Sequence, residues 1–137
     1  MNSQDFLQII NEAYAPFLSE LGLVLETPLV SGRYYRANIV GPKHAVSVSF
    51  EPGDRAFIVL VFSRENGRLS DIDDRLKTPR LSDLNSRFMN CVSNEERTAN
   101  EAMFKYIVVR DEEEKLMLKF AKELRLVLPK YLKESVL

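Results

Sequence analysis

The strongest constraint on the fold lies in residues 45–62, where two β-like segments flank a turn. The first segment, residues 45–51, alternates strictly between apolar and polar side chains, as in a strand with one buried face. Pro52-Gly53-Asp54 has the composition of a turn. The second segment, residues 56–62, is apolar throughout, which is typical of a strand buried on both faces or of a central strand flanked by neighbours. We therefore predict an antiparallel pair of strands, with one face formed by Val46, Val48 and Phe50.

Two further strands are expected before this pair. Residues 23–29 are apolar and β-prone but contain Pro28, which suits an edge strand or a strand end. Residues 33–40 follow a Ser31-Gly32 turn and are rich in β-forming side chains. Gly41-Pro42 separates them from the next strand. Because all connections are short, the four strands are expected to form an antiparallel meander.

A helical pattern precedes the strands. Residues 3–21 carry apolar side chains at steps of three and four, which predicts an amphipathic helix. Ser3 is the expected N-cap, and Gly22 stands where a helix commonly ends. Pro16 lacks a backbone N–H, so we expect a kink or two short helices meeting there.

Helical patterns return after the strands. A short helix with Ser82 as its N-cap is expected to run to about Met89, and another begins near Asn94. The β-branched run at 106–109 is compatible with either helix or strand. Asp111 to Glu114 has the form of a capping box and opens a final helix. The apolar face of that helix comprises Leu116, Met117, Phe120, Leu124, Val127, Leu128, Tyr131 and Leu132.

Together these elements predict an α+β fold in a single domain, residues 1–137. The sheet would be a four-stranded antiparallel meander, flanked by an N-terminal helix and two to three C-terminal helices. A chain of 137 residues that is 45% hydrophobic can bury one core of this kind. The helical side chains expected to cover the sheet are Phe6, Ile10 and Phe17 at one end and Leu116, Phe120 and Leu124 at the other.

Composition narrows the classes of function. With 19 Lys and Arg against 20 Asp and Glu, the formal net charge is −1, which argues against nucleic acid as a partner bound by bulk charge. Cys91 is the single cysteine, so no intramolecular disulfide forms and a reducing compartment is suitable. No apolar signal core follows Met1 and no run of about 18 apolar residues occurs, so we expect a cytoplasmic protein with no membrane segment.

Common catalytic and metal sites lack their residues in this chain. His44 is the single histidine, so a zinc site or a Ser-His-Asp site would be short of its usual groups. The five glycines stand singly, and none forms a glycine-rich phosphate loop. The sequence therefore predicts no catalytic residue, no metal and no cofactor.

Residues 63–81 are polar and are predicted to form a long loop, a kind of segment that often carries function. Asp71, Asp73 and Asp74 could hold a divalent cation through oxygen ligands, but the glycine and final glutamate of an EF-hand loop are missing. A solvated loop, or a surface that attracts a basic partner, explains the three carboxylates more simply. Arg68 and Arg75 lie among these acidic residues and are further candidates for partner contact.

Tyr34 is a candidate contact residue on the sheet. Adjacent residues of a strand point to opposite faces, so of Tyr34 and Tyr35 one is expected in the core and one at the surface. An exposed tyrosine between Arg33 and Arg36 suits a protein interface, where Tyr and Arg are enriched. Ordinary decoration of the sheet surface is the alternative interpretation.

About half of the chain resembles a known class of proteins in its layout. The segments are Gly32-Arg33-Tyr34-Tyr35 through Phe62-Ser63, residues 65–75 (Glu-Asn-Gly-Arg-Leu-Ser-Asp-Ile-Asp-Asp-Arg) and Leu81-Ser82-Asp83-Leu84-Asn85. They resemble small bacterial proteins, among them immunity proteins of polymorphic or contact-dependent toxin systems. The resemblance implies a small, cytoplasmic, non-enzymatic protein that binds one toxin domain tightly. The layout is also similar to type III secretion chaperones, which are small, α+β and dimeric, although usually more acidic.

Three functional hypotheses follow. The first is a non-enzymatic protein-binding module, most sharply an immunity protein that neutralises a cognate bacterial toxin, with Asp71, Asp73 and Asp74 attracting a basic partner. The second is a small-ligand binder or an enzyme that uses the same carboxylates together with Arg75. The third is a secretion-type chaperone or a homo-oligomeric subunit, with Tyr34 or the C-terminal helix at the contact.

Overall fold

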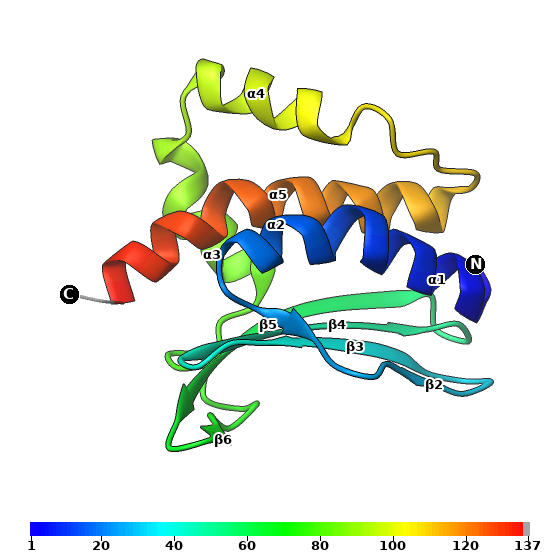
Figure 1. The fold of residues 1–137 in the computed structure, drawn as a ribbon, viewed down its shortest axis with the longest axis horizontal. Coiled ribbons are helices and arrows are strands. Elements are labelled where there is room, and N and C mark those ends of the chain that lie inside the picture. Colours follow the sequence, from blue (N-terminus) through cyan, green and yellow to red (C-terminus); the bar gives the residue numbers. More distant parts are fainter. Residues whose placement is uncertain (136–137) are drawn as a thin grey trace.

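The computed structural model describes residues 1–135, and the sheet in this part of the chain has six antiparallel strands (Figure 1). The strands are β1 (Val24–Leu25), β2 (Leu29–Val30), β3 (Tyr35–Val40), β4 (His44–Glu51), β5 (Ala56–Glu65) and β6 (Arg68–Leu69). The long strands β3, β4 and β5 form a meander, β1 and β2 both pair with β3, and β6 pairs with the end of β5. The predicted α+β class and antiparallel meander are confirmed.

The prediction of four strands is wrong at two places. The segment 23–29 forms two short strands, β1 and β2, because Pro28 between them cannot donate to the β-ladder. At the other edge, β5 runs on to Glu65 and a tight turn at Asn66 and Gly67 returns the chain to β6. The turn residues have φ angles of 52° and 77°, the left-handed geometry that Asn-Gly favours in hairpins. The predicted loop 63–81 therefore begins as a hairpin.

The N-terminal helical segment consists of α1 (Ser3–Ile9), the π-helical turn η1 (Ile10–Tyr14) and α2 (Ala15–Glu20). Asn2, rather than the predicted Ser3, is the N-cap, since its side chain accepts a hydrogen bond from the Asp5 N–H at 2.9 Å. Pro16 lies in the first turn of α2, where its missing N–H is tolerated, and the widened turn η1 directly precedes it. Gly22, with φ of 88°, follows the helix as predicted.

The C-terminal part contains α3 (Leu81–Phe88), the 3₁₀ turn η2 (Met89–Cys91), α4 (Asn94–Phe104) and α5 (Glu112–Ser135). The N-cap of α3 is Arg80 and not Ser82, because the Asp83 carboxylate accepts from the Arg80 N–H one turn back. Residues 107–110 are neither helix nor strand. Asp111 caps α5 as predicted, accepting from the Glu114 N–H at 2.8 Å.

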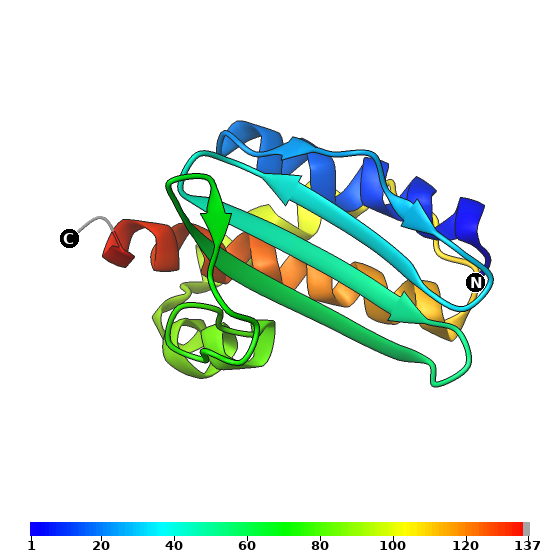
Figure 2. The ribbon, with the colours of Figure 1, turned by 90° about the horizontal axis from the view of Figure 1, so that it is seen from below.

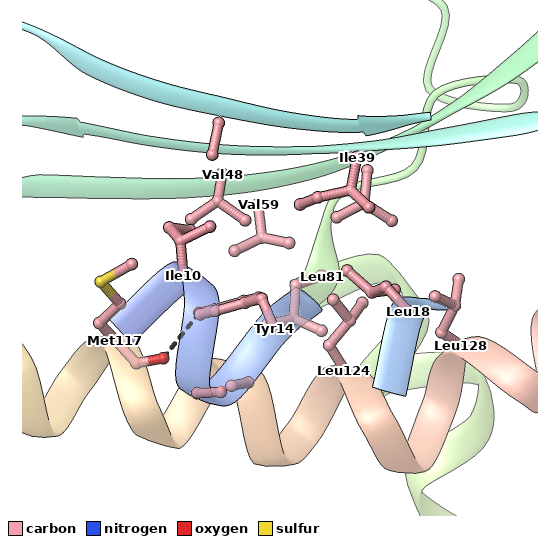
Figure 3. Packing of buried hydrophobic residues seen from close by; sticks show 14 of the residues in the cluster. Ile10, Tyr14, Leu18, Ile39, Val48, Val59, Leu81, Met117, Leu124 and Leu128 are labelled. Atoms are coloured by element: carbon pink, nitrogen blue, oxygen red, sulfur yellow. Dashed lines mark hydrogen bonds between the residues drawn. The ribbon is translucent and has the colours of Figure 1, made fainter. Parts of the chain in front are cut away.

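The described helices lie on one side of the sheet (Figures 1 and 2). The α1–η1–α2 segment lies beside α5 over the sheet, α3 packs against α5 and β5, and α4 lies on the outside of the helical layer. Figure 3 shows Tyr14 between the sheet and α5. The predicted core residues that are buried are Phe6, Ile10, Phe17, Leu124, Val46, Val48 and Phe50, whereas Leu116 and Phe120 are only half-buried.

α4 is attached to α5 mostly through polar groups. The buried Asn100 side chain donates to the Lys122 carbonyl and accepts from the Arg125 guanidinium, both at 3.0 Å. Ion pairs Lys122–Glu101 at 2.9 Å and Lys130–Glu96 at 3.1 Å flank it. The main apolar anchor of α4 is Phe104, whose ring meets Phe17 edge-on at 6.4 Å.

Candidate protein-binding surface

One face of the sheet is turned away from the helices, and the strand register identifies its residues. Tyr35, Ala37 and Ile39 of β3 are buried on the helical side, so the residues between them point to the other side. Directly paired residues of neighbouring strands share a side of the sheet. We call the surface formed by the outward-pointing side chains of β1 to β5 the outer face. One complete row across this face is apolar: Val24, Val40, Ala45 and Phe62.

β5 is apolar on both of its faces. Phe57, Val59 and Val61 point toward the helices, and Ile58, Leu60 and Phe62 point to the outer face. An antiparallel sheet with one face in water normally alternates apolar and polar residues, but β5 does not. Within residues 1–135 no helix covers the outer face, where Ile58 keeps 39% of its surface exposed (Figure 1). Of the outward residues of β5, Leu60 is buried and Phe62 is half-buried, so the part of this strand that lacks cover on the outer face is Ile58.

The outer face continues onto the edge strands beside β3. Val24 of β1 is 71% exposed and Leu29 of β2 is 58% exposed, and both belong to the outer face by their pairing with Val40 and Arg36. In the middle strand the outward residues are small, among them Ala45 and Ser47, both buried among their neighbours. The exposed apolar residues thus lie at the edges of the outer face, and the row that joins Leu29 to Ile58 has the polar Arg36 and Ser49 in its middle.

The predicted carboxylates of the loop serve the loop's own backbone. Asp71 accepts a hydrogen bond from the Asp73 N–H at 2.9 Å, and Asp74 accepts from the N–H groups of Leu76 and Lys77 at 3.1 and 3.2 Å. Asp71 and Asp73 are exposed, and Asp74 is half-buried. Among residues 1–135 no group of three or more His, Cys, Asp or Glu side chains is arranged to hold a metal ion. Asp71 and Asp74 therefore stabilise the turn, and in the described structure the exposed Asp73 carboxylate forms no hydrogen bond or ion pair.

Arg75 and Arg68 lie apart from these carboxylates in their contacts. Arg75 forms a two-pronged pair with Asp83, at 2.7 and 3.2 Å, and this pair lowers the pKa of the Asp83 carboxyl. Arg68 is exposed on β6 and lines an open cleft of about 540 Å³ around the β5–β6 hairpin. Other residues lining that cleft are Ser63, Glu65, Asn66, Leu69, Ser70 and Lys77, so Asp71, Asp73 and Asp74 do not converge on it.

Tyr34 lies at the opposite end of the sheet from the loop. It is half-buried and directly precedes β3, and the Arg36 guanidinium stands over its ring at 5.2 Å. Tyr35 pairs with Phe50 and so marks one end of the meander, whereas the loop follows the other end of β5. The structure thus places Tyr34 near the outer face, beside Arg36, and does not bring it together with Arg68 or Asp71.

The outer-face residues Val24, Leu29 and Ile58 were not singled out by the sequence reasoning. A signal for Ile58 was present, because a strand that is apolar throughout requires cover on both sides. Nothing in the local sequence says which side lacks it, since that depends on where the helices pack. Val24 and Leu29 flank Pro28 in a segment whose side orientation follows only from its pairing with β3.

The chain matches no protein-family model, and neither a curated protein nor a solved structure matches it. None of the helices described for residues 1–135 is both long and apolar enough to cross a membrane.

Proposed function

We propose that this chain is a protein-binding module that uses the outer face of its sheet to hold a partner. The observation that carries the proposal is the apolar character of β5 on both sides, with helices on one side only. A partner on the outer face would bury Ile58, Val24 and Leu29, which are now in contact with water.

Polar and charged groups lie around the outer face, as at the rim of a protein–protein interface. Arg36 and Tyr34 lie at one end, and the loop with the exposed Asp71 and Asp73 is attached beside the C-terminal half of β5, where the Ser63 N–H donates to the Lys77 carbonyl. Charged groups at a rim mainly guide association and add little to affinity once the partners are docked. In this proposal the loop attracts a basic partner, and the apolar residues of the outer face hold the partner once it is bound.

The sharpest form of the proposal is an immunity protein that neutralises a bacterial toxin domain. Its support is the resemblance in layout of residues 32–85 together with the exposed apolar residues Val24, Leu29 and Ile58 on the outer face. A toxin domain with a basic surface would suit the loop carboxylates.

The test is a comparison of three tagged baits in a lysate of the native host at near-physiological salt, with bound proteins identified by mass spectrometry. The baits are the wild-type chain, Val24→Glu/Leu29→Glu on the outer face, and the control Tyr106→Glu/Val108→Glu. The control changes two exposed apolar residues, both more exposed than Val24 and Leu29, in the segment between α4 and α5. We expect one stoichiometric partner with the wild type and the control, reduced at least about 10-fold with the outer-face variant.

A partner held equally by all three baits would contradict the assignment of the outer face. A wild-type bait without any stoichiometric partner would favour the ligand-binding or enzymatic alternative, which thermal-shift measurements with metals and nucleotides would then address. If the captured protein carries a toxic domain, co-expression of the wild-type chain should relieve toxicity, and Val24→Glu/Leu29→Glu should not.

A further inference from the structure

The edge of β5 that points away from β4 is covered by other parts of the chain along only half of the strand. Along the C-terminal half, residues 77–80 lie beside the strand: the Val61 N–H donates to the Pro79 carbonyl at 3.0 Å, and the Ser63 N–H donates to the Lys77 carbonyl at 3.1 Å. Beyond them, β6 pairs with the last residues of the strand. The chain thus adds its own extended segments to this edge.

The N-terminal half of the same edge, Ala56–Val59, is bare. Because the N–H groups of Val61 and Ser63 point away from β4, those of Phe57 and Val59 point the same way. Within residues 1–135 no strand pairs with Ala56–Val59 on this side, and Figure 2 shows the edge of β5 uncovered there. The segment reads Ala-Phe-Ile-Val and has none of the charges or prolines by which proteins usually protect an edge.

A slot of about 210 Å³ adjoins this bare edge. It is bounded by Phe57 and Ile58 of β5, by the start of α3, and by Phe120 of α5. The rings of Phe57 and Phe120 meet edge-on at 6.5 Å and both are only half-buried. Asn85 also lines the slot, and its Oδ1 atom is buried without a hydrogen-bond partner in the described structure. The half-covered aromatic pair leaves apolar surface beside the bare edge, and an occupant of the slot would bury it.

The charges around the slot are complementary to each other. Arg80 and Glu123 both line it, and the ion pairs formed within residues 1–135 include neither side chain. In a two-fold symmetric contact each surface meets its own copy, so a surface with one cation and one anion can pair with itself twice. A single unpaired charge of either sign would not have this property.

We propose that the bare edge Ala56–Val59 pairs with the same edge of a second copy of this chain, forming a two-fold symmetric dimer. The main-chain groups of Phe57 and Val59 join the two sheets, and Arg80 of each copy faces Glu123 of the other. The contact lies on the edge of the sheet and leaves the outer face free, so this inference stands apart from the proposed function and can fail without it.

The test is the molar mass in solution, measured by light scattering after size-exclusion chromatography. Loading concentrations run from about 5 to 500 μM, because small interfaces dissociate at micromolar concentrations. The expected mass rises with concentration from 15.8 kDa toward twice that value. Hydrogen exchange at the Phe57 and Val59 amides should slow over the same range.

Charge reversal separates this interface from any other. Arg80→Glu and Glu123→Arg should each weaken dimerisation at least about 10-fold, and the double variant should restore it. Arg33→Glu, the same change at an exposed residue on the turn between β2 and β3, should leave the mass unchanged. Circular dichroism confirms that each variant is folded. A wild-type chain that stays monomeric throughout, or a dimer that neither single reversal weakens, overturns the proposal.

Discussion

Tyr14 connects the first helical segment to the last through one buried hydrogen bond. Its hydroxyl donates to the Met117 carbonyl at 2.6 Å, and burial raises the pKa of the phenol, so the group remains a donor (Figure 3). Tyr14→Phe keeps the ring and removes the donor. We expect a loss of about 1–2 kcal/mol in the free energy of unfolding, measured by urea denaturation.

The matched control for this prediction is Tyr34→Phe. Tyr34 is half-buried, and its hydroxyl makes no hydrogen bond in the described structure. Its removal should change stability by no more than about 0.5 kcal/mol. If the two changes had equal effects on stability, the hydrogen bond of the Tyr14 hydroxyl would contribute nothing measurable to stability.

His44 makes stability depend on pH in a defined direction. Burial, and secondarily the charge of Lys43, lower the pKa of His44 below its ordinary value of 6.5. The unfolded chain therefore binds more protons than the folded chain in the pH range below that value. The stability associated with neutral His44 is fully present above pH 6.5 and is lost as the pH falls through the lower, folded-state pKa.

The measurement is the midpoint of thermal unfolding between about pH 7.5 and 5, compared for the wild type and His44→Gln. We expect the midpoint of the wild type to fall more steeply toward acid than that of the variant. His44 packs edge-on against Tyr131 at 5.9 Å, so the variant is also expected to be less stable at neutral pH. Parallel curves would contradict the assignment.

At the level of elements, α5 illustrates that the stability contributed by a side chain depends more on its position on the helix than on its size. Leu124 is fully buried, whereas Phe120 lies at the edge of the core beside the slot. We expect Leu124→Ala to lower the free energy of unfolding by about 2–5 kcal/mol and Phe120→Ala by only about 1–2 kcal/mol. Denaturant titration of the two variants checks the order, and a larger cost for Phe120→Ala would mean that the slot is closed in solution.

Elements with a long periodic pattern could be predicted from the sequence, and elements defined by contacts could not. The alternation at 45–51 and the stripe after Asp111 are long enough to specify strand and helix by themselves. β6 has two residues, and it exists because the Asn66-Gly67 turn brings it back onto β5. Residues 106–109 combine a tyrosine with three β-branched side chains but pair with no strand, so their β-propensity alone gives no structure.

At the scale of the whole molecule, the sequence predicts the layers better than the surfaces. Hydrophobic periodicity identifies Val46, Val48 and Phe50 as a core face, because burial there follows from pattern alone. It does not show that Asp71 and Asp74 bind backbone N–H groups of their own loop, since a short carboxylate forms such bonds only when the turn has formed. Nor does it show which faces and edges of the finished sheet remain uncovered.

Because α4 is attached mainly by polar contacts, we expect it to unfold separately from the rest of the molecule. Because α4 is held by Asn100, two ion pairs and Phe104, its detachment costs far less than separation of the sheet from α5. We expect a state with α4 detached and the rest native to be populated before global unfolding, and to be more populated at high salt, which screens the ion pairs. Cleavage by proteases is then expected first in and around α4, at a rate set by this local opening and not by the stability of the core.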